Sequence, residues 1–136
     1  MDLCDESKIM RIRELRKKAH AWYKEKSKVY RAFLEMEKAT YSDGALKKKD
    51  KELIAIGISV AQNCESCMEW HISQAFANGA AAEEILEAVE VGIEMSGGPG
   101  TVAARFAMNV MEFYEKDEIR NEELNKNIQY RISNDQ

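Results

Sequence analysis

The chain of 136 residues contains one proline and no long apolar run. Besides having Pro99 as its only proline, it rarely alternates apolar and polar residues as half-buried strands do, so the sequence predicts an all-helical protein. The longest apolar stretch, LIAIGISVA, falls well short of the roughly 20 residues of a membrane span. The polar start, MDLCDESKIM, lacks the apolar segment of a signal peptide. These absences predict a cytoplasmic protein without a membrane partner.

Positive charge is not in surplus either. The net charge is −4 and the isoelectric point is near 5.3, which argues against a nucleic-acid partner. A short lysine cluster at 47, 48, 49 and 51 lacks interleaved aromatic residues, and it is better explained as a solvated approach to a helix that starts near Asp50. The glycine-rich SGGPG at 96–100 lacks the GK[ST] of a phosphate-binding loop, so it predicts a connection between helices.

Cysteine is scarce as well, with three residues in the chain. Three are too few for a disulfide framework, and a CxxC pair in an intracellular protein is more often catalytic or metal-binding than structural. Cys4 lies in the polar N-terminal segment and is interpreted as an incidental thiol. The other two form the sequence CESC, so the candidate chemistry is concentrated around Cys64 and Cys67.

These two thiols lie close in sequence to an imidazole. A helix over about 64–78 would place Cys64, Cys67 and His71 on one face together with apolar residues. We therefore expect the thiols to face the core and not water. A helix N-terminus lowers the pKa of a cysteine from roughly 8.5 towards neutrality, and a second thiol three residues away can close a disulfide. The pair is a candidate redox site.

A carboxylate precedes the thiols by a fixed interval. Glu52 begins the evenly apolar run, which predicts a helix buried on most sides. A turn near Gln62 and Asn63 would fold the chain back and could bring Glu52 beside His71. His71 could then shuttle a proton while Glu52 orients the imidazole and stabilises its charge.

The same residues also suggest two metal-containing sites. The two thiols and His71 could supply three zinc ligands, but a fourth would have to come from Glu52, His20 or Cys4, and a second CxxC is absent. A c-type haem site needs histidine directly after the second cysteine, where this chain has Met68. Purely structural burial would require a coincidence of four residues. The sequence therefore predicts neither a metal nor a cofactor.

The remaining sequence predicts further helices. One runs over about 7–26 and another over about 28–39; Phe33 and Met36 of the second are expected in the core. The predicted apolar stripes of these two helices are Ile9, Ile12, Leu15, Ala19 and Trp22, and Val29, Phe33 and Met36. Gly79 is expected to end the site helix in the left-handed conformation.

Beyond Gly79, one helix opens at about 80–84, another covers about 101–115, and a charged segment follows at about 117–132. The predicted inward residues are Ile85, Leu86, Val89, Gly92 and Ile93, then Val102, Phe106, Val110 and Phe113. The charged segment carries the thin stripe Ile119, Leu124, Ile128 and Ile132. Such a stripe suits packing on a neighbouring subunit better than building a core.

The spacing of Glu52, Cys64, Cys67 and His71 resembles the pattern of the AhpD-like alkylhydroperoxidases within the carboxymuconolactone decarboxylase family, a glutamate, eleven residues, then CxxCxxxH. The resemblance extends to ALKKKDKELIAIGISVAQNC and ANGAAAEEILEAVEVG and covers about 30–115. It implies one all-α domain over 1–136, a helical bundle of about six helices with its core at about 30–115, an N-terminal helix and a polar C-terminal helix. It also implies assembly into homotrimers or homohexamers.

The same resemblance implies a thiol-dependent peroxidase. Cys67 would attack the peroxide and Cys64 would resolve the resulting sulfenic acid, with Glu52 and His71 as a proton relay. Ser66, where the best-studied type of AhpD has histidine, would contribute its hydroxyl. Reasoning from the residues alone favours Cys64 as the nucleophile, because it is nearer the helix end. The implied partners are a peroxide and a dithiol reductant of the lipoyl or thioredoxin-like kind.

Other functions remain open. A dithiol-disulfide oxidoreductase or redox carrier would use the same cysteine pair and serve a protein or lipoyl partner. A muconolactone decarboxylase is the other activity in the family, but such members typically lack the two cysteines. A non-enzymatic subunit or redox sensor would form the disulfide without turnover.

Overall fold

The computed structural model describes residues 5–134, except for the side chains at 119, 120, 124, 127 and 134. Within residues 5–134 there are six helices and no strand, which confirms the all-helical prediction. The helices are α1 (Glu6–Lys26), α2 (Lys28–Thr40), α3 (Lys48–Ala61), α4 (Glu65–Ala77), α5 (Ala82–Ser96) and α6 (Gly98–Asn134). No helix in the described part of the chain is long and apolar enough to cross a membrane.

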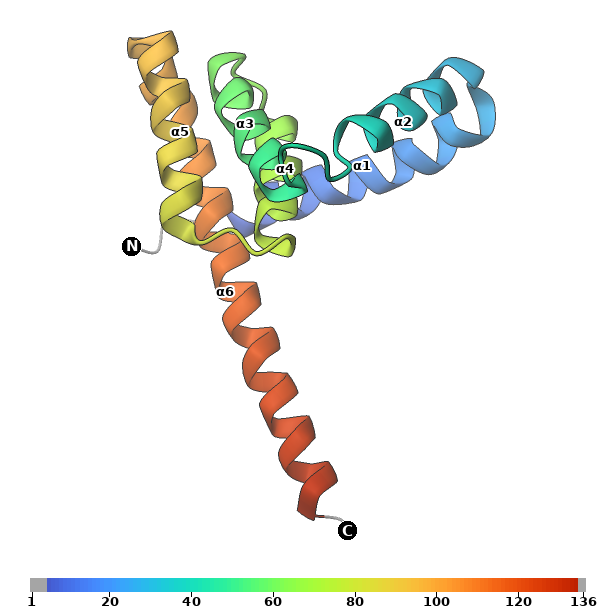
Figure 1. Ribbon diagram of the computed structural model, residues 1–136, viewed down its shortest axis with the longest axis vertical. Coiled ribbons are helices and arrows are strands. Elements are labelled where there is room, and N and C mark those ends of the chain that lie inside the picture. The colour runs from blue at the N-terminus through green and yellow to red at the C-terminus, as the bar shows by residue number, and fades with distance from the viewer. Residues whose placement is uncertain (1–4, 135–136) are drawn as a thin grey trace.

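The helices form a bundle with two projections (Figure 1). In the bundle, α3 packs against α4 and α5, while α4 and α5 pack against the first half of α6. The antiparallel α1–α2 hairpin extends to one side, and the second half of α6 continues beyond the bundle (Figure 1). Asp5 and Ser27 accept backbone N–H bonds at the N-termini of α1 and α2, which fixes where each helix begins.

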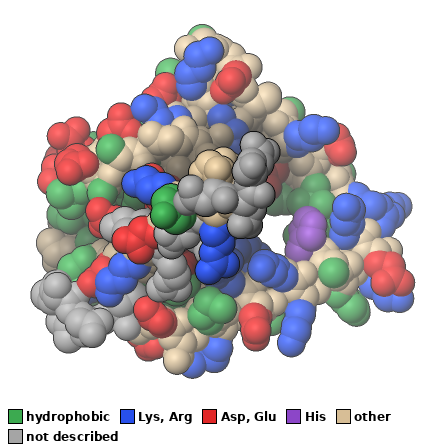
Figure 2. Space-filling model, turned by 90° about the horizontal axis from the view of Figure 1, so that it is seen from below, with side chains coloured by type: hydrophobic (Ala, Val, Ile, Leu, Met, Phe, Trp, Pro, Cys, Tyr) green, Lys and Arg blue, Asp and Glu red, His purple; other side chains and the backbone are tan. Residues whose placement is uncertain are grey.

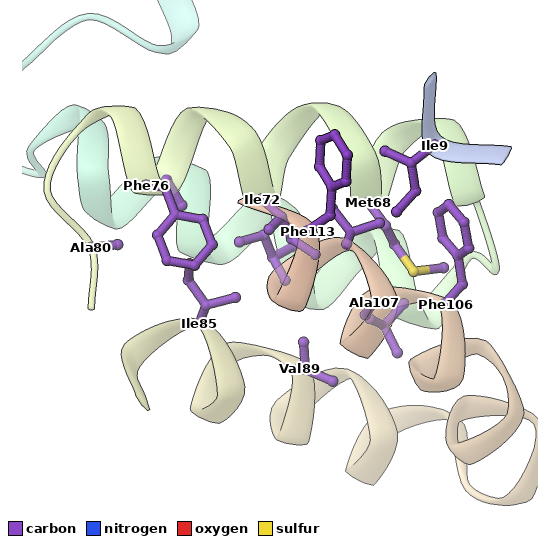
Figure 3. Packing of buried hydrophobic residues seen from close by; sticks show 14 of the residues in the cluster. Ile9, Met68, Ile72, Phe76, Ala80, Ile85, Val89, Phe106, Ala107 and Phe113 are labelled. Atoms are coloured by element: carbon purple, nitrogen blue, oxygen red, sulfur yellow. The ribbon is translucent and has the colours of Figure 1, made fainter. Parts of the chain in front are cut away.

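The hydrophobic core lies where α4, α5 and α6 meet (Figure 3). Met68 and Ile72 of α4 are fully buried, and they pack with Ile85 of α5 and Ala107 of α6. The start of α1 adds Ile9, which is also fully buried. Packing in this core holds α4, the helix that carries the thiols, against the rest of the bundle.

Two glycines let α3 and α5 approach closely. A Cβ atom built on Gly92 would lie 2.6 Å from the carbonyl oxygen of Gly57, and one built on Gly57 would lie 3.1 Å from the carbonyl oxygen of Ala88. Real side chains do not fit at the first of these distances, so the helix contact requires Gly92. Gly79, at φ +86°, ends the α4 segment in the left-handed conformation, as predicted.

The predicted inward faces of the first two helices are largely wrong. Only Ile9 of α1 is buried, and none of the described α2 side chains is buried. Phe33 and Met36, expected in the core, are 49% and 59% exposed. The other exposed members of the predicted apolar sets are Leu15, Trp22, Val29, Leu86 and Val102. Beyond the start of α1, where Ile9 and Ile12 reach the core, the hairpin projects away from the bundle and the rest of its apolar stripes are left largely uncovered.

The chain after the glycine-rich connection also differs from the prediction. The expected break between 115 and 117 is absent, and one helix of 37 residues runs from Gly98 to Asn134. Of the predicted C-terminal stripe, Ile128 and Ile132 are 45% and 53% exposed, while the side chains of Ile119 and Leu124 lie outside the described residues. Packing of this stripe on a neighbouring subunit stays a prediction.

Candidate active site

A tight reversal between α3 and α4 builds the site. Asn63 takes the left-handed conformation at φ +51°, which asparagine tolerates better than most residues, and the chain turns back on itself. Cys64 is the N-cap of α4, and the backbone N–H of Cys67 donates to its Sγ at 3.2 Å. Cys64 and Cys67 form a disulfide. The predicted CxxC pair therefore lies in the first turn of the predicted helix.

The reversal brings the predicted carboxylate and imidazole into contact. Nδ1 of His71 lies 2.7 Å from Oε2 of Glu52, across the packed pair of helices. Glu52 is 1% exposed, whereas the His71 side chain is 16% exposed. An ionised carboxylate only accepts hydrogen bonds, so Nδ1 carries the proton and Nε2 becomes the acceptor on the other side of the ring.

Lys48, one turn before Glu52 on α3, binds the second carboxylate oxygen. Its Nζ lies 2.8 Å from Oε1 of Glu52. Burial raises the pKa of Glu52, but the hydrogen bonds and charges of His71 and Lys48 outweigh it, so the pKa of this carboxyl lies below its ordinary value. The lysine cluster is thus not simply solvated, since Lys49 also pairs with Glu84 and Lys51 binds the carbonyl oxygen of Ser42.

A cavity of about 650 Å³ opens beside the disulfide, between α4 and the α1–α2 hairpin. Its α4 wall is formed by Ser66, Cys67, Trp70 and His71. The facing wall is formed by Arg16, Lys17, His20, Tyr30, Phe33, Leu34 and Glu37. Figure 2 shows an opening in the molecular surface with a histidine, basic and hydrophobic side chains along one side of it.

The direction of the thiols corrects one prediction. The core face of α4 is formed by Met68, Ile72 and their neighbours, whereas Cys67 is only partly buried and lies on the cavity wall with His71. Cys67 and Met68 are adjacent in the helix, so their side chains point in directions about 100° apart. The predicted core face of α4 wrongly included Cys67, which lies on the cavity wall next to the buried Met68.

Sequence reasoning missed a buried polar network behind the site. Glu69 of α4 is 0% exposed, forms an ion pair with Arg16 of α1, and accepts a hydrogen bond from the hydroxyl of Tyr114 of α6. Burial raises the pKa of Tyr114, which keeps its hydroxyl a donor. The guanidinium of Arg16 also lies 4.8 Å from the centre of the Trp70 ring. The sequence contains one indication that Glu69 is buried: it lies on the same helical face as the apolar residues Ile72 and Phe76.

The alternative zinc ligands are not assembled around the thiols. Among residues 5–134, no group of three or more histidine, cysteine, aspartate or glutamate side chains has an arrangement that could hold a metal ion. His20 is 2.9 Å from the hydroxyl of Tyr30 within the hairpin, and Cys4 lies outside the described residues. Four of the five predicted site residues, Cys64, Ser66, Cys67 and His71, lie at or in the first two turns of α4, and Glu52 lies behind His71.

Comparisons with known proteins agree with this architecture. The sequence model of the carboxymuconolactone decarboxylase family matches residues 27–109. An uncharacterised protein of Cupriavidus necator is 40% identical over 77 residues, which cover 57% of this chain and 68% of that protein. An uncharacterised protein of the cox locus of Paracoccus denitrificans is 38% identical over 81 residues, 60% of this chain and 73% of that protein.

Solved structures show the same fold. The crystal structure of a carboxymuconolactone decarboxylase family protein from Legionella pneumophila has a TM-score of 0.69 and 30% identity, covering 82% of this chain and 97% of that one. A family protein from Thermotoga maritima, for which a part in the antioxidative response has been suggested, has a TM-score of 0.76 and 25% identity, covering 82% of this chain and 96% of that one.

Proposed function

Because the chain belongs to the carboxymuconolactone decarboxylase family, we propose that it is a thiol-dependent peroxidase of the alkylhydroperoxidase type. One observation carries the proposal: a cysteine of the CxxC disulfide and a histidine bonded to a buried carboxylate line the same cavity. The suggested role of the Thermotoga maritima relative in the antioxidative response supports the same proposal.

The reaction has three steps. His71 takes the proton of the Cys67 thiol, and the thiolate attacks the terminal oxygen of the peroxide. The O–O bond breaks, the leaving alkoxide takes that proton from His71 and departs as the alcohol, and Cys67 becomes a sulfenic acid. Cys64 then attacks the sulfenic sulfur, and the disulfide forms with release of water. A dithiol reductant of the lipoyl or thioredoxin-like kind returns the pair to two thiols and itself becomes a disulfide.

Access supports Cys67 as the attacking cysteine. Of the two described thiol positions, Cys67 is on the cavity wall, whereas Cys64 caps the helix. The helix N-terminus favours a thiolate at Cys64 in the reduced protein, since the Cys67 N–H points at its sulfur. A peroxide must first reach the sulfur, and His71 Nε2 can accept the thiol proton on the cavity side. Ser66 also lies on this wall, where its hydroxyl can donate to a bound peroxide.

The size of the cavity favours one alternative, a dithiol-disulfide oxidoreductase. About 650 Å³ is at the scale of drug-sized ligands and far more than a peroxide group needs. A dithiol on a flexible arm could therefore reach the disulfide from the same cavity. The two functions share the third step above and differ in what oxidises the thiols.

The proposal is tested on reduced protein by stopped-flow peroxide consumption, with thiols counted by mass spectrometry before and after one equivalent of peroxide. We expect two thiols to be lost as a Cys64–Cys67 disulfide. Cys67→Ser should abolish consumption, because the attacking sulfur is gone. Cys64→Ser should keep the first step and accumulate a sulfenic acid that a dimedone probe labels at Cys67.

Three outcomes would count against parts of this scheme. Thiols that remain reduced for hours exclude the peroxidase. Labelling at Cys64 in Cys67→Ser, with none in Cys64→Ser, reverses the two cysteine roles. Reduction of a lipoyl or thioredoxin disulfide without peroxide consumption favours the oxidoreductase. Cys4→Ser is the matched control, because it removes a thiol from outside the CxxC pair and should leave the rate unchanged.

A further inference from the structure

The carboxylate of Glu52 has two nitrogen partners. Glu52 places one oxygen 2.7 Å from His71 Nδ1 and the other 2.8 Å from Lys48 Nζ. The ammonium of Lys48 is positively charged whether or not the imidazole carries a second proton. The spacing of Lys48 and Glu52, one turn apart on α3, lets the ammonium reach the carboxylate from the solvent side.

This arrangement solves a charge problem in the proton relay. A carboxylate that is 1% exposed needs a compensating positive charge close by. If His71 were its only partner, an ionised Glu52 would favour the protonated imidazole more strongly, and the ring would accept a proton from a thiol less readily. With Lys48 present, the charge of Glu52 is balanced whether His71 is neutral or protonated.

We propose that Lys48 is a positioning residue of the relay: it neutralises Glu52 so that His71 can accept and return a proton near neutral pH. The inference rests on the proposed role of His71 in the thiol reaction, but the charge arrangement that it describes can be measured without any substrate. Lys48 acts through Glu52 and lies outside the glutamate–CxxC–histidine pattern.

Tyr41, the C-cap of α2, contacts both His71 and Lys48. Its ring lies 5.4 Å from the His71 ring, and the Lys48 Nζ lies 5.5 Å from the centre of the Tyr41 ring. Burial raises the pKa of Tyr41, and the carboxylates of Glu52 and Glu37 raise it further. Tyr41 therefore remains uncharged and adds no negative charge that would compete for Lys48.

A second cavity, of about 330 Å³, opens on the Lys48 side. It is lined by Lys48, Glu52 and Tyr41, and it shares Leu34, Glu37 and Trp70 with the cavity of the disulfide. His71 therefore lines the cavity of the sulfur, and Glu52 lines the adjoining cavity of Lys48. The charged groups around the relay from other elements are Glu37 and Lys38 of α2, Arg16, Lys17 and His20 of α1, and the Lys49–Glu84 pair between α3 and α5.

The test follows the His71 ring by NMR as a function of pH. The chain has two histidines, so the two ring signals are assigned with a His20→Gln variant. Lys48→Gln and Lys48→Met should raise the pH at which the His71 ring titrates by about one unit relative to wild type, because a neighbouring positive charge is removed. Lys48→Arg should restore the wild-type titration, since it keeps the charge.

Lys51→Gln is the matched control, because it removes one positive charge from the same helix at a residue that binds the carbonyl oxygen of Ser42 instead of Glu52. The inference is overturned if His71 titrates in Lys48→Gln as in wild type, or if Lys51→Gln gives an equal shift. If Lys48→Met fails to fold, which the His20 signals and circular dichroism report, Lys48→Gln decides the question.

Peroxide kinetics separate this inference from the proposed function. If wild type consumes peroxide, the acidic limb of its pH–rate profile should move upward in Lys48→Gln by the same amount as the titration of His71. If wild type does not consume peroxide, the proposed function fails while the NMR result still decides whether Lys48 balances the charge of Glu52.

Discussion

The bundle and the α1–α2 hairpin are built from similar helices with different surroundings. In both regions apolar residues recur three and four positions apart. In α4, Met68 and Ile72 of such a stripe are fully buried, whereas in α2 Val29 and Met36 are 73% and 59% exposed. The hairpin is held by polar and ring contacts, with His20 bonded to the Tyr30 hydroxyl and the Tyr23 and Tyr30 rings 5.5 Å apart.

The comparison shows that an amphipathic pattern predicts a face and not what covers it. The bundle covers the apolar face of α4 with other helices, while the hairpin projects from the bundle and leaves most of its own large apolar side chains exposed. The cavity of the site lies between these two regions, with Cys67 on the bundle side and Phe33 and Tyr30 on the hairpin side. Changes in the bundle should therefore affect stability, and changes in the hairpin should affect assembly and the cavity.

The largest effect on stability is expected from Ile72→Ala in the bundle. Ile72 is fully buried among α4, α5 and α6, and a truncation of this kind leaves a cavity that costs about 2 to 5 kcal/mol of unfolding free energy. Urea denaturation followed by circular dichroism measures the loss. Leu15→Ala in the hairpin is the control, because Leu15 is 70% exposed and should cost less than about 0.5 kcal/mol. Equal losses in the two variants would contradict the division into bundle and hairpin.

The second effect concerns the ion pair that joins the two regions. Arg16 of α1 pairs with Glu69, which is 0% exposed, while the Arg16 side chain is 28% exposed. Arg16→Met keeps the apolar length of the side chain but leaves a buried carboxylate without its cation. The full penalty for breaking a buried pair is about 3 to 5 kcal/mol, and the partial exposure of Arg16 reduces our expectation to about 2 kcal/mol.

The pH dependence distinguishes this charge effect from lost packing. Protonation of Glu69 removes the uncompensated charge, so the difference between Arg16→Met and wild type should be full at neutral pH and shrink as the pH falls through the acidic range. Urea midpoints between pH 3 and pH 8 measure it. In the double variant Arg16→Met with Glu69→Gln the difference should be nearly independent of pH. A constant difference in the single variant would show that packing, not charge, causes the loss.

Much of the site could be predicted from the sequence because it depends on local spacing. The interval between Glu52 and His71 spans two helices and one turn, and the turn at Gln62 and Asn63 could be recognised from residue types alone. The distance of 2.7 Å between Glu52 Oε2 and His71 Nδ1 confirms the prediction that this turn brings the two residues together. The attacking cysteine could not be chosen this way, because two residues three positions apart share one helical face but differ in their access to the cavity.

The features that sequence reasoning missed depend on contacts between distant segments. The Arg16–Glu69–Tyr114 network joins α1, α4 and α6, and no local pattern pairs residues that are 53 and 45 positions apart. The predicted break near 116 was wrong for a different reason. The charged composition after 115 suggested a new segment, but 115–134 contains no glycine or proline to interrupt the hydrogen bonds of a helix.

The smallest effect on the protomer is expected in α2, where Val29→Ser and Met36→Ser combined should change its unfolding free energy by less than about 0.5 kcal/mol per substitution. The same substitutions remove the most exposed apolar residues of α2, and large exposed apolar patches mark surfaces that bind partners. If the predicted homotrimer or homohexamer uses the hairpin, the double variant should elute as smaller species by light scattering while its circular dichroism is unchanged. An unchanged mass would place the interface elsewhere, for which Val91 and Met95 of α5, at 61% and 75% exposed, are the next surface to substitute. Loss of helical signal would instead show that α2 contributes to the stability of the protomer, and it would remove the contrast between hairpin and bundle.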